Sequence, residues 1–189
     1  MAYNVPAYDV NKMSFGPGVL YLCAITSTPG VVTEATDLVD IGGVNSGGTL
    51  NLTRSALEVN QGSPAARVAT FVTQETAQLS VTGIEWDLGN LALALGAGVV
   101  DEISDPQTFG FGGSMNITNV AVKFVHEMHT GQTLSIRFWS AESDGNMSVT
   151  FGDQIHEIPY TFNALETSTG WDSTALAATE RLCQISIDG

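Results

Sequence analysis

The sequence predicts a mainly β protein, a sandwich or barrel of antiparallel strands with one short flanking α-helix. Three observations lead to this fold class. The first two are short segments in which apolar and polar residues alternate, and turn signals at regular intervals between them. The third is that apolar residues show helical spacing in a single segment. No linker or internal repeat divides the 189 residues, so we expect one domain over residues 1–189.

The helix is expected at residues 87–96. Asp87 is a favourable N-cap, and Gly96 is the residue type that best accepts the left-handed conformation after a helix. The strand before the helix changes its alternation at Gly83, and this pattern predicts a β-bulge there. The apolar residues of the helix recur at the spacing of one helical face: Leu88, Leu91, Ala92 and Leu95.

Strands are expected in most of the remaining chain. One of them, residues 18–25, is apolar on both faces, so it must be covered twice, by its own domain or by a neighbouring subunit. Residues 97–116 are interpreted as a glycine-rich connector, and residues 166–178 as irregular. The other expected strands are residues 38–41, 49–54, 79–86, 120–124, 134–138, 147–151, 158–162 and 181–187.

Two segments do not contribute to a core of their own. Residues 1–17 are interpreted as an N-terminal arm, whose aromatic residues Tyr3, Tyr8 and Phe15 indicate contact with an apolar surface. Residues 56–73 contain two strand-like pieces around a tip of small residues, with too few apolar side chains to build a core. This pattern predicts a long projecting hairpin or loop, and in globular domains such loops are usually functional or disordered.

The charge balance is strongly acidic: 20 Asp and Glu residues stand against six Lys and Arg residues, a formal net charge of −14 at pH 7. A protein that binds nucleic acid tightly needs Lys and Arg to replace the counterions of the phosphates, so this class is disfavoured. Two interpretations remain open. The charge keeps copies apart in solution, or it forms a surface that nucleic acid passes without binding.

The two cysteines and the apolar content indicate a soluble intracellular product. Cys23 and Cys183 lie near opposite ends of the chain, and we expect two buried free thiols. The N-terminus has no basic region followed by an apolar run, as a signal peptide has. No apolar run approaches the roughly 20 residues that span a bilayer.

No catalytic or metal-binding pattern is convincing, and we expect neither an enzyme nor a cofactor. His126, Glu127 and His129, with His156 further on, include zinc-ligand types, but positions three apart on a strand point to opposite faces. Glu85 and Asp87 have the spacing of a glycosidase acid pair. Helix capping by Asp87 and solvation of Glu85 on the strand explain both residues better.

Three segments resemble, in this order along the chain, the major tail tube proteins of long-tailed bacteriophages. They are residues 15–22 (FGPGVLYL), residues 83–96 (GIEWDLGNLALALG) and residues 158–165 (IPYTFNAL). The resemblance implies a β-sandwich-like barrel with one flanking helix. It also implies that copies form hexameric rings, which stack into a tube around a channel for DNA.

The resemblance further implies partners and contact segments. In such tubes the long hairpin and the terminal arm reach the adjacent subunit or ring. The partners would be other copies of the chain and tail proteins of the tape measure, terminator and baseplate or tip classes. DNA would pass without specific binding, and the protein would be located in the virion without membrane insertion. The candidate inter-subunit contacts are Tyr3, Tyr8, Phe15, Gln61, Gly62, Ser63, Pro64, Ala65 and Ala66.

The alternative function is glycan binding by a β-sandwich of a virion-decorating or receptor-binding protein. Such a site needs exposed aromatic rings on which sugars stack, and Trp86, Trp139 and Trp171 are the candidates. Trp86 and Trp139 lie in expected strands, so we expect both in the core.

Overall fold

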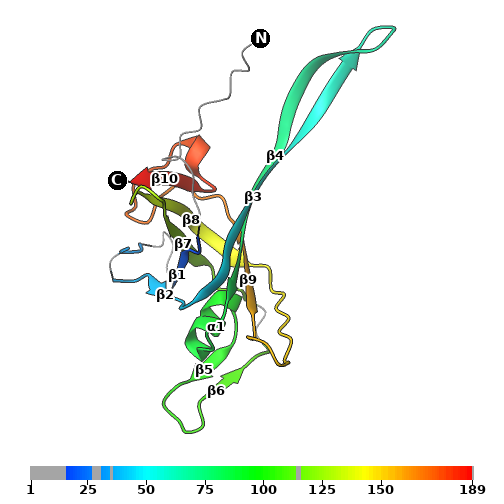
Figure 1. Cartoon of the computed structure of the whole chain (residues 1–189). Coiled ribbons are helices and arrows are strands. Elements are labelled where there is room, and N and C mark those ends of the chain that lie inside the picture. The colour runs from blue at the N-terminus through cyan, green and yellow to red at the C-terminus, as the bar shows by residue number, and fades with distance from the viewer. Residues whose placement is uncertain (1–15, 27–30, 35, 114–115, 189) are drawn as a thin grey trace, which may run out of the picture.

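The computed structural model describes residues 16–26, 31–34, 36–113 and 116–188, and it is mainly β with one α-helix among these residues, which confirms the predicted fold class (Figure 1). The elements are β1 (Val19–Ala24), β2 (Val39–Asp40), β3 (Val44–Gln61), β4 (Ala66–Gly83), α1 (Leu88–Leu95), β5 (Val99–Asp101), β6 (Thr108–Gly110), β7 (Val120–Glu127), β8 (Thr133–Ser143), β9 (Ile158–Ala164), the 3₁₀ turn η2 (Ala178–Glu180) and β10 (Gln184–Asp188).

The large sheet is antiparallel and folds over on itself. Its strand order is β2-β1-β7-β8-β9-β4-β3, and β10 pairs with β8 beside this path. The two ends of the path, β2 and β3, are consecutive in the chain and are joined by residues 41–43 alone. The sheet therefore has to curl so that its first and last strands come near one another. β5 and β6 form a separate small sheet near α1.

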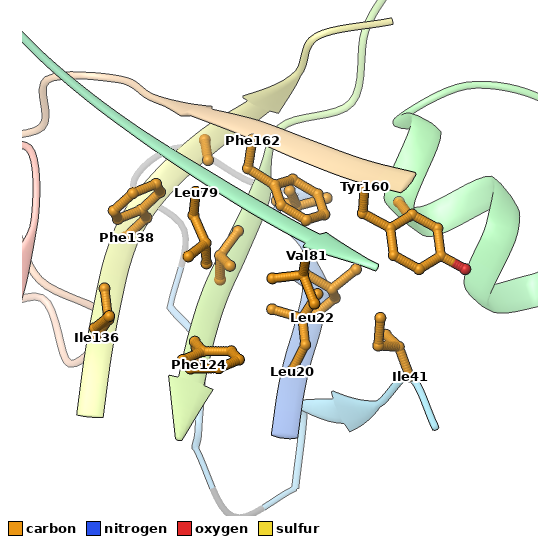
Figure 2. Close-up of a cluster of buried hydrophobic side chains, with 14 of the residues drawn as sticks. Leu20, Leu22, Ile41, Leu79, Val81, Phe124, Ile136, Phe138, Tyr160 and Phe162 are labelled. Atoms are coloured by element: carbon orange, nitrogen blue, oxygen red, sulfur yellow. The ribbon is translucent and has the colours of Figure 1, made fainter. Parts of the chain in front are cut away.

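The main core lies between β4 with β9 on one side and β1, β7 and β8 on the other. Leu20, Phe124 and Ile136 face it from three neighbouring strands, because the register pairs Leu20 with Phe124 and Phe124 with Ile136. Leu79 and Val81 of β4 pack against them from above (Figure 2). All five side chains are less than 9% exposed.

The outer face of β1 is covered by the same chain. Cys23 on this face packs with Ala121 of β7 and with Val32 and Trp171 from the connecting segments. Trp171 and Val32 are joined by a backbone hydrogen bond of 3.0 Å from the Val32 N–H to the Trp171 carbonyl. The sequence left open whether this face is covered by the same domain or by a neighbouring subunit, and the structure shows loops of the same domain on it.

The predicted strands 49–54 and 79–86 and the predicted projecting hairpin 56–73 are parts of one long hairpin, β3–β4. Both strands have 18 residues, and their pairing runs from Val44 with Gly83 at the base to Gln61 with Ala66 at the tip. The bulge expected at Gly83 is wrong. β4 ends there in unbroken register with β9, and the extra residues near this end lie on β3, between Asn45 and Gly48.

The helix is confirmed with its caps. The Asp87 side chain accepts a hydrogen bond of 2.7 Å from the backbone N–H of Asn90, and Gly96 has the left-handed φ of 62°. The buried face is shifted slightly from the predicted one, because Ala94 is buried in place of Ala92: Leu91, Ala94 and Leu95.

Three other predicted segments differ from the structure. Residues 147–151 form no strand, although Met147 and Val149 still pack on the core. The glycine-rich connector 97–116 contains the β5–β6 hairpin. The last strand begins at Gln184, three residues later than expected.

Candidate functional site: the distal hairpin

The most exposed part of the molecule is the outer portion of the β3–β4 hairpin, residues 51–76, which we call the distal hairpin. It extends away from the rest of the structure as a two-stranded ribbon (Figure 1). Every residue in it is exposed except Ala69, which is partly exposed. An isolated two-stranded hairpin is only marginally stable in water, so such a ribbon gains most from contact with another surface.

The apolar side of the hairpin changes from one face to the other along its length. At the base, Leu50 and Leu52 pair with Leu79 and Ala77 on the face that covers the core. Between Ser55 and Ala56 the register shifts, because β4 carries an extra residue there. The first pair beyond this point, Ala56 with Val72, stays on the face of Leu52, and the next apolar pairs lie on the opposite face, since successive residues of a strand alternate. We call this set the apolar face of the distal hairpin: Leu57, Val59, Ala69 and Phe71.

The other face of the distal hairpin carries all of its charges. Arg54 pairs with Glu75, with its Nη2 2.6 Å from the carboxylate Oε1, and Arg67 forms an ion pair with Glu58. Such exposed pairs add only about 0–1 kcal/mol each to stability. Their larger consequence is electrostatic: the distal hairpin has no net charge, although the whole chain carries −14.

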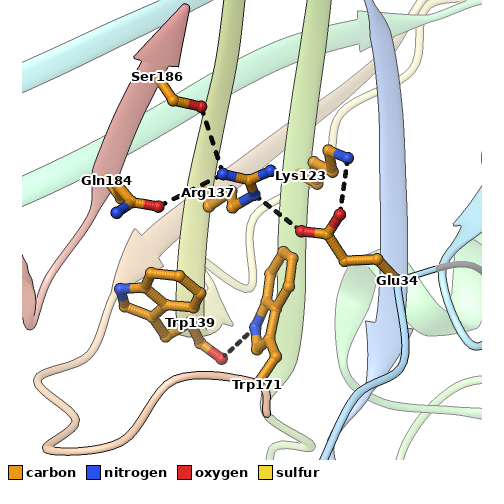
Figure 3. A network of polar contacts seen from close by, with 7 residues as sticks. All are labelled: Glu34, Lys123, Arg137, Trp139, Trp171, Gln184 and Ser186. Carbon is orange, nitrogen blue, oxygen red and sulfur yellow. Dashed lines mark hydrogen bonds and ion pairs between the residues drawn. The ribbon is translucent and has the colours of Figure 1, made fainter. Parts of the chain in front are cut away.

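The remaining bases of the described residues are also paired with glutamates. Glu34 accepts from Lys123 Nζ at 3.1 Å and from Arg137 Nε at 2.8 Å (Figure 3). Arg181 Nη1 lies 3.0 Å from Glu166 Oε1. Over the described part of the chain, every Lys and Arg thus has a Glu partner, with Lys123 and Arg137 sharing Glu34, and the other carboxylates form no ion pair with a base.

Two of the three tryptophans are held by hydrogen bonds within the chain, and Figure 3 shows the bond between Trp171 and Trp139. The indole N–H of Trp171 donates to the Trp139 carbonyl at 3.0 Å, and that of Trp139 donates to the Glu180 carbonyl at 2.8 Å. Their rings meet edge to face, 5.3 Å between centroids. Arg137 holds β10 from the same network, with Nη1 3.3 Å from both Gln184 Oε1 and Ser186 Oγ.

The expectation that Trp86 lies in the core is wrong. β4 ends at Gly83, so Trp86 follows the strand and is 48% exposed. Its ring stacks on Phe151 at a centroid distance of 5.9 Å, and Phe151 in turn meets the His156 ring at 5.0 Å. This aromatic group is the exposed one that the alternative glycan function requires.

The residues considered for catalysis are held in structural contacts. Asp87 caps α1, and Glu85, which lies outside β4, accepts a hydrogen bond of 2.9 Å from the backbone N–H of Gly43. His126 is buried with Nδ1 2.9 Å from the Pro17 carbonyl oxygen, so Nδ1 carries the proton of this bond. His129 follows the end of β7 and is exposed.

Two further groups were considered as chemical sites. Among the residues that the structure describes, no three His, Cys, Asp or Glu side chains are grouped so that they could hold a metal ion. Both cysteines are free and partly buried. Burial raises the pKa of Cys183, and burial together with the nearby charge of Asp37 raises the pKa of Cys23, so both thiols are weak nucleophiles.

The structure gathers one of the two predicted contact groups. Gln61 is the last residue of β3, Ala66 is the first of β4, and residues 62–65 make the exposed turn between them. Tyr3, Tyr8 and Phe15 lie outside the described residues. The apolar face of the distal hairpin was not anticipated. Its signal in the sequence is the change from even-numbered to odd-numbered apolar positions along β3.

No protein-family model matches this chain, and no curated protein matches it. None of the described helices is long and apolar enough to cross a membrane.

Proposed function

We propose that this chain is a structural protein that assembles with copies of itself into hexameric rings, which stack into the tail tube of a bacteriophage. The observation that carries the proposal is the distal hairpin, whose apolar face is left without a partner in the single chain. Leu57, Val59 and Phe71 are 58%, 38% and 59% exposed. Fully burying one such side chain contributes roughly 1.5–3 kcal/mol, which favours contact with a neighbouring copy.

The distribution of charge supports the passage of DNA through such a tube. Because the described Lys and Arg residues are all paired, the surface offers carboxylates and no free cation to a phosphate backbone. Binding of DNA needs cations that displace its counterions. A channel lined by these carboxylates would repel the DNA phosphates and offer them no binding site.

The test is the assembly state of the purified protein in negative-stain electron microscopy. We expect rings or tubes of constant diameter. A monomer that stays monodisperse at high concentration, in the presence and absence of salt, contradicts the proposal.

A second candidate function, glycan binding, is favoured by the exposed stack of Trp86 on Phe151. A sugar ring that covered Trp86 would change its fluorescence, and Trp86→Phe would remove the change. Trp139 and Trp171 are no longer candidates, since their indole N–H groups bond within the chain and Trp171 is 4% exposed.

A further inference from the structure

We propose that the apolar face of the distal hairpin of one copy docks into a groove between the hairpin base and the C-terminal segment of the next copy. The inference rests on the proposed self-assembly and specifies which two surfaces of the chain meet. Both surfaces belong to the same chain, and neither is covered within it.

The groove lies where the distal hairpin leaves the rest of the molecule. It has a volume of about 360 Å³. Its apolar lining comes from Leu52 and Ala77 of the hairpin, and from Leu182 and the free thiol of Cys183 in the segment before β10. The Arg54–Glu75 ion pair and the side chains of three threonines complete the lining: Thr53, Thr76 and Thr179. Leu182 and Cys183 also pack against the main core, so the groove opens directly onto core side chains.

Next to the groove, apolar side chains of β10 on the core side of the sheet are exposed. A row of paired residues crosses four strands on the core side: Leu20 of β1, Phe124 of β7, Ile136 of β8 and Ile185 of β10. Their exposed fractions are 0%, 6%, 8% and 48%, so the cover ends at β10. Ile187, the next β10 residue on that side, is 57% exposed. The outer edge of β10 has no strand partner among the described residues.

The hairpin of the same chain does not fill this groove with its apolar face. Leu52 lines the groove from the core side of β3, whereas Leu57 lies on the opposite side of the same strand, because the two positions differ by an odd number. The apolar face therefore points away from the groove, and only a second molecule brings the apolar face to Leu52, Ala77 and Leu182. Contacts between different patches of identical chains propagate from copy to copy.

Charge favours the distal hairpin as the occupant. Each chain carries −14, so two copies repel each other on average. The distal hairpin contains four charged residues in two internal ion pairs, so it approaches without net repulsion. It is thus both apolar on one face and electrically neutral.

The experiment uses the native thiol of Cys183 as a reporter in the groove. In a Cys23→Ser background, Leu57→Cys places a second thiol on the apolar face. Ala56→Cys, one residue earlier on the opposite face, is the matched control, and Val59→Cys repeats the test at a second apolar position. Each variant is assembled, checked for tubes by electron microscopy, treated with a short bismaleimide and separated on a denaturing gel.

We expect a ladder of covalent multimers from Leu57→Cys and Val59→Cys, at least several-fold stronger than from Ala56→Cys. The ladder should disappear when Cys183→Ser is added. Tubes in which Cys183 reacts with a monofunctional maleimide but which give no ladder, or equal ladders from both faces, overturn the docking proposal and leave self-assembly standing. Absence of any assembly from the Cys23→Ser parent, in which the hairpin is unchanged, overturns both.

Discussion

Tyr160 explains several residues at the base of the hairpin. A Cβ at Gly83 would lie 2.6 Å from Tyr160 Cε2, so the glycine is needed where the ring packs across the end of β4. The ring is 3% exposed, and burial, with a smaller contribution from the charge of Asp87, raises the pKa of Tyr160 to about 12. The phenol is therefore held in its neutral form by the fold.

This pKa predicts a loss of stability at high pH. In the unfolded chain a tyrosine loses its proton near pH 10, whereas in the folded chain Tyr160 keeps it until about pH 12. The unfolded state is thus favoured progressively as the pH rises through this window. We expect the free energy of unfolding to fall by about 1 kcal/mol between pH 9 and pH 11 from this residue, as measured by urea denaturation.

Tyr160→Phe should remove this part of the pH dependence. A pH slope that stays the same in Tyr160→Phe as in the parent chain would contradict the assignment to Tyr160.

At the scale of elements, the β3–β4 hairpin performs two separate tasks. Its base, paired with β9, carries Leu79 and Val81 into the main core. Its distal part contributes no buried side chain, since all of residues 51–76 are at least partly exposed. The distal part is therefore dispensable for folding and available for contact.

Shortening the hairpin should separate these two tasks. Replacing residues 57–71 by Asn-Gly joins Ala56 to Val72, which are paired in the register, through a two-residue turn of the type that hairpins favour. We expect the midpoint of thermal unfolding to stay within a few degrees, because no core residue is removed. Tube formation in electron microscopy should be abolished. Normal tubes from the shortened chain would contradict the role of the distal hairpin in assembly.

The sequence predicts local structure better than pairing, and the reason is physical. Each cap of α1, Asp87 and Gly96, bonds to a residue within one turn of itself. Both caps can therefore be predicted from the local sequence. The extent of the hairpin depends on cross-strand partners up to 39 positions apart, such as Val44 and Gly83. Trp86 was misplaced for the same reason, because the end of β4 is decided by its pairing with β9.

The candidate site was predictable only in part. The exposed tip from Gln61 to Ala66 can be predicted, because the local sequence there consists mostly of small residues. The apolar face does not, because Leu57 and Phe71 form one surface only after the register shift brings them opposite each other. A pattern of alternation along one strand carries no information about an extra residue in the other.

For the whole molecule, assembly brings together copies that repel each other. Each chain carries −14 on a surface whose described bases are already paired, so the repulsion acts between entire subunits. At 0.01 M salt the screening length is about 30 Å, and at 0.15 M it is about 8 Å. Apolar contact between a neutral distal hairpin and the groove of the next copy is short-ranged and does not depend on this screening.

Assembly should therefore become more favourable with salt. We expect the lowest protein concentration that yields tubes to fall several-fold between 10 mM and 150 mM sodium chloride, measured by sedimentation. Glu102→Gln combined with Asp105→Asn removes two exposed carboxylates and should weaken this dependence. A critical concentration that rises with salt would indicate attraction between unlike charges and would refute this account.

One extra residue in β4 has a consequence for how this hairpin can vary in length. Thr73 has no partner in β3, and it moves Phe71 to the same side as Leu57. If the same residues paired without the bulge, Phe71 would lie opposite Glu58 on the core side while Leu57 faced outward. The bulge at Thr73 thus decides whether the ribbon has one continuous apolar side or two incomplete ones. A chain one residue shorter, with Thr73 deleted, would keep Leu57 opposite Phe71 with no bulge at all.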